Sequence, residues 1–388
     1  MFPQLTAAQV LPADGYAGTL IGRALYPGVF PGPCVAVIRE DGVHNISGTI
    51  ATVAELLNQP NPLGIIHRAL SNCAYLGTVD ELLANSTPET HDPLKPYFLT
   101  PIDLQAVKGT GVTFVGDMLQ RLADENGGAA TVQLIERAAD QDIHAIRPGT
   151  KQAQAVRDVL IEAGLWSAYL EVGFGPDIEL FTKAQPLSTV GLGAEIGLHP
   201  DSIHNFAEPE LVMVTDGQGR PRGVTMGVDL TLCDVEARSP LLLGKAKDNT
   251  ASSAVGPFIR LFDESFSMPS VQGMKMTYIF EGPDSTVITD AGSMEDISRS
   301  LISLVRQTVN EHHGYPDGVA LYTGTMFSAP TERGGQGPFT HMIGDVVTIK
   351  TPALGGLVTR INATNQTRRW NFGLADLMQN LAARQLLG

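Results

Sequence analysis

Apolar and polar positions alternate along two short segments in the middle of the chain, with a turn between them. Leu211 to Val214 is an apolar run of strand length, and a second run begins at Val224. The connecting segment, Asp216-Gly-Gln-Gly-Arg220, is rich in residues that turns prefer. The pattern predicts a β-hairpin. Strand signals of this kind dominate from Tyr169 to Asp290, which indicates a mixed β-sheet core.

The first hundred residues show shorter elements of both kinds. Strand-like segments cover residues 19–25 and 34–39, and an Asp41-Gly42 turn leads from the second into Val43. Helical patterns follow at residues 50–57 and 79–84, before a proline-containing stretch at residues 91–101. We therefore expect a small N-terminal α+β domain over residues 1–100 and a larger domain over residues 101–388.

The larger domain is expected to contain several helices. Helical patterns at residues 118–125, 131–139 and 156–163 predict a helical insert at about residues 115–168. Ser293 carries the signal of a helix N-cap, and apolar positions continue on one face to Val305. A last helix is predicted from Leu374 to Leu387, packed on the body of the chain or on a partner subunit.

Three carboxylates gather on the predicted hairpin. Glu208 and Glu210 are two residues apart, so they share one face of a strand. Centring the hairpin on its turn places position 216 opposite 223 and Glu210 opposite Asp229. Like charges directly opposite each other are destabilising, and a hard divalent cation removes the conflict. The pattern predicts a Mg²⁺ site with positions left for water or substrate, and a solvated acidic edge is the alternative.

Acidic and basic residues flank the hairpin in sequence. Glu179 and Lys183 alternate with Phe181 on one face of a predicted strand, and Lys245 and Lys247 follow Asp229 on what we expect to be another strand face. A lysine near a metal can stabilise an enolate or bind a carboxylate. Surface lysines and an ordinary cross-strand ion pair are the alternatives.

The order of these motifs resembles that of the fumarylacetoacetate hydrolase family, from about Val112 to Ile361. The resemblance implies an α+β fold whose catalytic domain is a mixed β-sheet roll or barrel-like structure. It also implies a Mg²⁺ (or Mn²⁺) enzyme acting on 2-oxo acids, with Glu208, Glu210 and Asp229 as the metal ligands. The matching motifs are Glu208-Pro-Glu210, Gly227-Val-Asp229, Gly244-Lys245-Ala-Lys247, Gly256-Pro257, Pro316-Asp317-Gly318, Thr323-Gly324-Thr325 and Gly344-Asp345.

Within that family, the Glu-Leu-Phe-Thr-Lys-Ala segment at residues 179–184 is most similar to the branch that dehydrates 2-keto-3-deoxy sugar acids. The resemblance implies that Glu179 and Lys247 are catalytic and that Lys183 and Thr325 help to hold the substrate carboxylate. The choice of lysine is ambiguous. Gly244-Lys245 matches some members locally, whereas the 18-residue step from Asp229 favours Lys247. Lys245 is therefore retained as a substrate-binding candidate.

A departure from the family pattern favours dehydration over hydrolysis. Hydrolases of the family carry a histidine and a glutamate that activate water, where this chain has Asp117 and Gln120. Neither side chain reproduces an imidazole poised near neutral pH. We expect dehydration of 2-keto-3-deoxypentonate to 2-oxoglutarate semialdehyde. The alternatives are a C–C hydrolase of 2,4-diketo acids or acylpyruvates and a non-catalytic cation-binding protein.

Composition narrows the remaining classes. A net charge of −15 argues against a nucleic-acid partner, which needs a basic surface. The three cysteines have neither disulfide-framework nor zinc spacing. The chain shows no targeting segment and no apolar run of membrane-spanning length, so we expect a cytoplasmic protein without a membrane partner. It is expected to form a homodimer or homotetramer, and His341 is a candidate for the rim of the pocket.

Overall fold

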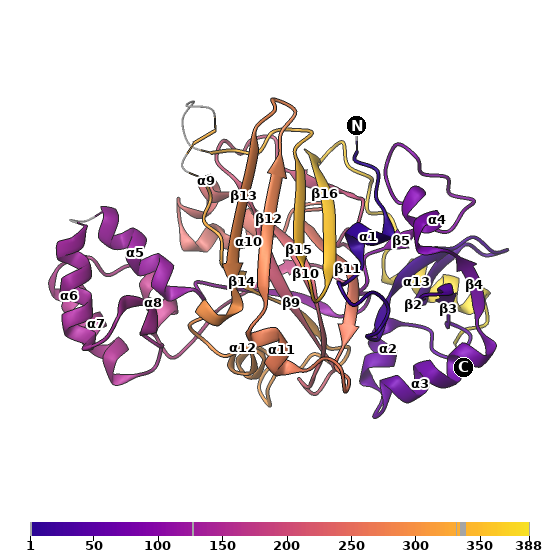
Figure 1. Ribbon diagram of the computed structural model, residues 1–388, viewed down its shortest axis with the longest axis horizontal. Coiled ribbons are helices and arrows are strands. Elements are labelled where there is room, and N and C mark those ends of the chain that lie inside the picture. The colour runs from indigo at the N-terminus through magenta and orange to yellow at the C-terminus, as the bar shows by residue number, and fades with distance from the viewer. Residues whose placement is uncertain (1, 126–127, 331, 334–338, 388) are drawn as a thin grey trace.

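Two β-sheets with helices around them make up the chain (Figure 1). The computed structural model describes residues 2–125, 128–330, 332–333 and 339–387. Over these ranges, no helix combines the length and the apolar character needed to cross a bilayer. The predicted α+β class is confirmed. In the part of the chain that is described, both sheets have free edge strands, so the expected roll does not close into a barrel.

The larger sheet extends through most of the molecule. Its order is β4-β3-β2-β1-β11-β10-β9-β14-β6-β7, and β5 pairs with β1. Strand β14 runs parallel to β6, and the other neighbouring pairs are antiparallel. Because β1 pairs with β11, the N-terminal strands continue the sheet of the rest of the chain. The strands are β1 (Leu20–Tyr26), β2 (Gly32–Arg39), β3 (Gly42–Asn45), β4 (Ala74–Gly77), β5 (Phe98–Leu99), β6 (Ala106–Gly111), β7 (Glu179–Ala184), β9 (Phe206–Thr215), β10 (Pro221–Thr231), β11 (Ser253–Leu261) and β14 (Val319–Thr325).

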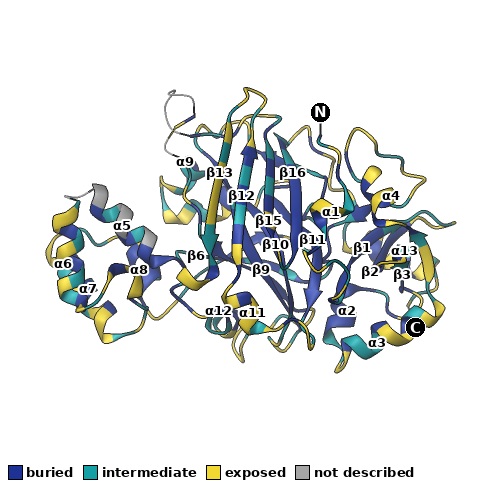
Figure 2. Cartoon of the chain, viewed as in Figure 1, coloured by how far each residue is buried: buried dark blue, intermediate teal, exposed yellow. Residues whose placement is uncertain are grey.

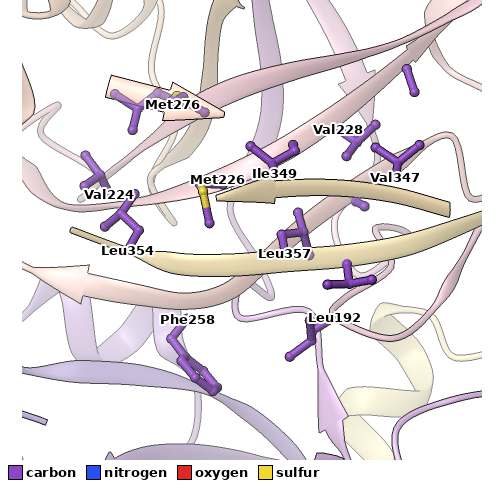
Figure 3. Packing of buried hydrophobic residues seen from close by; sticks show 14 of the residues in the cluster. Leu192, Val224, Met226, Val228, Phe258, Met276, Val347, Ile349, Leu354 and Leu357 are labelled. Atoms are coloured by element: carbon purple, nitrogen blue, oxygen red, sulfur yellow. The ribbon is translucent and has the colours of Figure 1, made fainter. Parts of the chain in front are cut away.

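A second sheet packs on one face of the first. Figure 3 shows Met226 of β10 among side chains of the second sheet, including Ile349 and Leu357. The order of this sheet is β13-β12-β15-β16-β8, in which β16 and β8 are parallel. Its strands are β8 (Glu195–Leu198), β12 (Lys275–Glu281), β13 (Val287–Ser293), β15 (Val346–Thr351) and β16 (Gly355–Ala363).

Strand β9 contributes to hydrophobic cores on both faces of the large sheet. Leu211 and Met213 belong to the core between the two sheets. Val212 and Val214 point to the opposite face and join a core with helices α2 (Val53–Asn58) and α3 (Pro62–Ala69). A strand covered on both faces has no polar side, which explains the continuous apolar run in the sequence.

Four helices form a separate group at one end of the molecule (Figure 1). Leu119, Ile135 and Val156 belong to a hydrophobic core of their own. Exposed residues cover the outer sides of this group, as expected for amphipathic helices (Figure 2). The helices are α5 (Val115–Glu125), α6 (Ala129–Ala139), α7 (Lys151–Glu162) and α8 (Ala168–Phe174).

The remaining helices are short. The list is α1 (Ala7–Val10), α4 (Val79–Ala84), α9 (Cys233–Glu236), α10 (Leu243–Lys247), α11 (Met268–Gln272), α12 (Leu301–Thr308) and α13 (Leu374–Ala383), with 3₁₀ turns at Leu70–Asn72, Ile143–Ala145, Pro240–Leu242 and Met294–Asp296.

Two helix predictions need correction. The continuous helix predicted from Ser293 is wrong, because Ser293 caps only a 3₁₀ turn and α12 starts later, with Ser300 as its cap. The break is held by tertiary contacts, since Ser298 N–H donates to Thr113 O and the Arg299 guanidinium donates to the carbonyl of Gly175. The last helix ends at Ala383 rather than at Leu387.

Candidate active site

The hairpin of β9 and β10 brings the three predicted carboxylates together, in a register that differs from the predicted one. Glu208 lies opposite Asp229, and Glu210 lies opposite Gly227. The predicted pairing of Glu210 with Asp229 is wrong by two residues, because the hairpin closes with Thr215 opposite Pro221 and not with position 216 opposite 223. The irregularity between Pro221 and Gly223 makes up only one residue of the difference. A shift of two keeps every side chain on its face, so the convergence survives.

The three carboxylates can offer oxygens to one cation. One oxygen each from Glu208, Glu210 and Asp229 lie within 4.8 Å of one another. Such a set of hard oxygen donors fits Mg²⁺ or Mn²⁺ better than a soft metal. Burial raises the pKa of Glu210 well above its ordinary value, and the nearby Asp229 and Glu208 raise it further. A bound divalent cation would relieve this like-charge conflict.

Lys247 provides the positive charge in this cluster. Its Nζ lies 2.8 Å from Glu208 Oε2, 3.1 Å from Asp229 Oδ2 and 2.6 Å from Thr231 Oγ1. Burial disfavours the ammonium, but Asp229 and Glu208 outweigh it and raise the pKa of Lys247 well above its ordinary value. Lys247 therefore remains charged at neutral pH.

The two lysines of the ambiguous pair lie on a helix rather than on the expected strand. Both belong to α10, where Lys247 is buried and faces the carboxylates. Lys245 is exposed and lies outside the wall of the pocket. Successive positions on a helix point in different directions, so a separation of two places the side chains apart. The geometry favours Lys247, and we assign no substrate contact to Lys245.

Lys183 lies behind the carboxylates and is fully buried. Its Nζ is 2.8 Å from Asp229 Oδ1, and it also donates to the carbonyls of Leu230 and Lys247 and to Ser252 Oγ. Burial lowers the pKa of Lys183, although Asp229 opposes the shift. The ammonium does not line the pocket. These contacts support a role in positioning Asp229, in place of the substrate contact expected from the sequence.

We expect Lys183→Met to lower the free energy of unfolding by about 3 kcal/mol, because it removes one partner of a buried ion pair. This loss of stability lies at the lower end of the usual range for breaking a buried ion pair, since Lys247 still contacts Asp229. Chemical denaturation measures the change. The exposed Lys245→Met is the matched control and should change stability by no more than about 0.5 kcal/mol. Equal stability of the two variants would contradict the positioning role.

Glu179 reaches the same site from β7. Its carboxyl lines the pocket close to Gly111, where a Cβ would lie 1.8 Å from Glu179 Oε2. Glycine at 111 therefore gives the carboxyl its room. Burial raises the pKa of Glu179, with Lys247 opposing the shift and Glu208 adding to it. On the same strand, the Phe181 ring lies under the Lys247 ammonium, 5.1 Å from Nζ to the ring centroid.

A cavity of about 450 Å³ unites these groups, within the usual range for small-molecule sites. Its floor includes Glu208, Glu210 and Lys247. Thr325 lines it at the end of β14, with its hydroxyl donating to Pro209 O at 3.0 Å. The outer wall includes apolar side chains of α5 and α8, so the helical group forms part of the pocket.

Titratable residues that sequence analysis did not place there also line the pocket, among them Tyr169, His204 and Glu236. Burial raises the pKa of Glu236 to about 7, with Lys247 opposing and Glu208 adding to the shift. The only sequence signal for Glu236 is its place just after the strand that carries Asp229. No spacing rule separates it from the acidic residues around it.

His341 does not lie at the rim of the pocket. It is buried, with Nδ1 3.0 Å from Asp345 Oδ2 and its ring stacked on Phe206, which itself lines the cavity. The prediction is wrong because Phe206 stands between the imidazole and the pocket. Asp117 and Gln120 both lie on α5, but their side chains are outside the part of the chain that the structure describes.

Comparison with known proteins gives relatives for about half of the chain. No protein-family model matches it. A 2-dehydro-3-deoxy-D-arabinonate dehydratase of Saccharolobus solfataricus is 30% identical over 183 residues, which is 47% of this chain and 58% of the relative. A probable 2-keto-3-deoxyxylonate dehydratase of Haloferax volcanii is 30% identical over 196 residues, 50% of this chain and 64% of the relative. The matches span less than two thirds of either relative.

Solved structures share the fold over a greater length. A 2-keto-3-deoxy-D-arabinonate dehydratase complexed with magnesium and 2,5-dioxopentanoate matches with a TM-score of 0.59 and 20% identity, over 89% of this chain and 99% of the other. A fumarylacetoacetate hydrolase from Exiguobacterium antarcticum matches with a TM-score of 0.53 and 16% identity, over 89% and 99%. At these identities the likeness establishes the fold.

Proposed function

We propose that this chain, which has the fold of the fumarylacetoacetate hydrolase family, is a Mg²⁺-dependent dehydratase of a 2-keto-3-deoxy sugar acid. The substrate would be a 2-keto-3-deoxypentonate and the product 2-oxoglutarate semialdehyde. The observation that carries the proposal is a three-carboxylate cluster, two of whose members line one cavity together with Glu179 and Lys247. The two dehydratases that match half of the chain support the choice of reaction.

In this proposal, Glu208, Glu210 and Asp229 hold the metal, and the same oxygen donors also suit Mn²⁺. Bound Mg²⁺ would act as a Lewis acid that polarises the 2-oxo group and makes the C3 hydrogens more acidic. Lys183 keeps Asp229 in place through its ion pair. The backbone N–H of Gly324 does the same for Glu210, to which it donates at 2.6 Å.

Glu179 and Lys247 act on the substrate itself. Glu179 moves a proton during the elimination, since its carboxyl faces the cavity and its raised pKa brings it closer to the working pH. The ammonium of Lys247 stabilises the negative charge that develops as the C3 proton leaves. Thr325 also lines the cavity and helps to hold the carboxylate end of the substrate.

Dehydration is preferred to C–C hydrolysis because Asp117 and Gln120 replace the water-activating pair of the hydrolases. We expect kcat/KM for a 2-keto-3-deoxypentonate to exceed that for an acylpyruvate or 2,4-diketo acid at the same Mg²⁺ concentration. Release of semialdehyde and of pyruvate, measured side by side, distinguishes the two. Faster cleavage of the diketo acid would overturn the proposal. A non-catalytic cation-binding protein would leave every substrate unchanged.

We also propose that the protein acts in the cytoplasm as a homodimer or homotetramer, with the domain boundaries expected above. The observation in favour of assembly is on α13, where Leu374 is 51% and Met378 is 65% exposed. The two side chains are one helical turn apart, so they form a small apolar surface that another subunit would cover. Light scattering coupled to size exclusion tests the assembly, and a monomer at micromolar concentration would refute it.

A further inference from the structure

Glu236 is an acid of the pocket that has no role in the reaction so far. It is the last residue of α9, the short helix that follows β10 almost directly. Its side chain is half-buried and lines the cavity. Within the described residues, its carboxyl oxygens have no hydrogen-bond or ion-pair partner, so the forces on it are burial and the charges around it.

The candidate metal ligands are different in this respect. Glu208 accepts hydrogen bonds from Thr231 and Lys247, and Glu210 accepts one from the backbone of Gly324. Asp229 has Lys183 and Lys247. A polar group that faces a cavity without a protein partner is available to whatever binds there. Glu236 is such a group.

Charged and titratable side chains surround Glu236 from several elements. Burial raises its pKa to about 7, and Lys247 is the group that opposes the shift. The carboxylates of the cluster act in the same direction as burial, so the neutral form is well populated at neutral pH. The surrounding groups are Glu179 on β7, Glu208 on β9, Asp229 on β10, Lys247 on α10, Tyr169 on α8 and Cys233 on α9 itself.

The charge balance of the site favours a neutral acid. The site contains the carboxyls of Glu179, Glu208, Glu210, Asp229 and Glu236, against the ammonium groups of Lys183 and Lys247. With a divalent cation present, one negative charge is left over when every carboxyl is ionised. A 2-oxo acid brings another, and like charges brought together repel. A proton on one unpaired carboxyl reduces this excess from two negative charges to one.

We propose that Glu236 is a further catalytic residue, a neutral acid that protonates the departing C4 hydroxyl. The inference rests on the dehydration proposed above. One C3 proton passes to Glu179, its bonding electrons form the C3–C4 double bond, and the C4–O bond breaks. The proton of Glu236 completes the departing water. Glu236 then recovers a proton from solvent, Glu179 loses its own, and the alkene tautomerises to the semialdehyde.

The test compares Glu236→Gln with Glu264→Gln, an exposed glutamate outside the pocket. The amide keeps the shape but has no acid proton. We expect kcat to fall by about a hundredfold or more, the usual scale for a positioned acid, while KM changes little. Mg²⁺ affinity from calorimetry and the melting temperature should match those of the wild type. The control should be unchanged throughout.

The pH profile tests the proton on Glu236. A general acid is active while protonated, so wild-type kcat should fall as pH rises through the pKa that Glu236 has in the enzyme–substrate complex. The residual activity of Glu236→Gln should lack this limb. Suppose that the wild type forms semialdehyde and that the kcat of Glu236→Gln is within threefold of the wild-type kcat. The role of Glu236 would then be overturned, and the proposed function would still stand.

A binding experiment separates the two proposals. Pyruvate, a 2-oxo acid without a C4 hydroxyl, is titrated into the Mg²⁺-loaded protein at pH 7 in buffers of different ionisation enthalpy. The arriving anion raises the pKa of Glu236, so the wild type should take up protons and Glu236→Gln should not. A wild type that forms no semialdehyde refutes the proposed function. Even then, loss of proton uptake in Glu236→Gln would locate the proton on Glu236. Equal proton uptake by the wild type and the variant would overturn the role of Glu236.

Discussion

Glu210→Gln is expected to abolish turnover and to weaken Mg²⁺ binding beyond calorimetric detection. Glu210 is buried, and its carboxyl already accepts a hydrogen bond from Gly324 N–H, so it is held in place for a cation. The amide removes the negative charge from one of the three oxygens that can meet at a single ion. The same loss is expected for the amide variants of Glu208 and Asp229.

The fold should survive this change. Burial and the neighbouring acids raise the pKa of Glu210, so a neutral side chain relieves repulsion in the metal-free protein. Thermal melting without metal should therefore be the same as, or higher than, that of the wild type. Full turnover of the variant, or of the wild type in excess chelator, would show that the carboxylate cluster has no catalytic metal.

Glu179→Gln and Lys247→Met are each expected to lower kcat by about a hundredfold or more, the scale of a positioned proton-transfer or charge-stabilising group. Glu179 faces the cavity without a hydrogen-bond partner in the described part of the chain, and Lys247 is the cation of the cavity floor. Steady-state kinetics at saturating Mg²⁺ measures both. At saturating Mg²⁺, the bound ion balances the negative charge of the carboxylates that no longer contact Lys247.

Lys245→Met is the matched control, because it removes a lysine from the same helix two positions away. It should retain wild-type kcat, since its side chain is exposed outside the pocket. If Lys245→Met is the damaging change and Lys247→Met is silent, the assignment of the catalytic lysine is wrong. Melting temperatures of both variants exclude loss of fold as the cause.

The sequence predicted the strands well because their signals are local. The apolar run at Leu211 to Val214 and the turn at Asp216 are visible without any tertiary information. The register was wrong by two residues, because the turn sequence does not show that the hairpin closes with Thr215 opposite Pro221. The break after Ser293 was missed for a related reason, since contacts with Thr113 and Gly175, distant in sequence, hold it.

The sequence predicted those site residues that belong to recognisable motifs. The two-residue step from Glu208 to Glu210 fixed their common face, whatever the register. Lys183 and Lys247 look alike in the sequence and both are buried. Only the fold shows that Lys247 lines the pocket and that Lys183 contacts Asp229 from behind. Glu236 was missed because it is distinguished by having no hydrogen-bond or ion-pair partner among the described residues. A sequence does not show whether a side chain has a partner.

The candidate ligands and their lysine all lie within one continuous segment, from Glu208 to Lys247, whereas part of the outer wall of the cavity comes from α5 and α8. Metal binding and part of the substrate wall are thus encoded in separate stretches of the chain. The wall can be exchanged or redesigned by replacing one compact insert, which has a hydrophobic core of its own. Divergence of substrate range between related enzymes would then require no change in the segment that binds the metal.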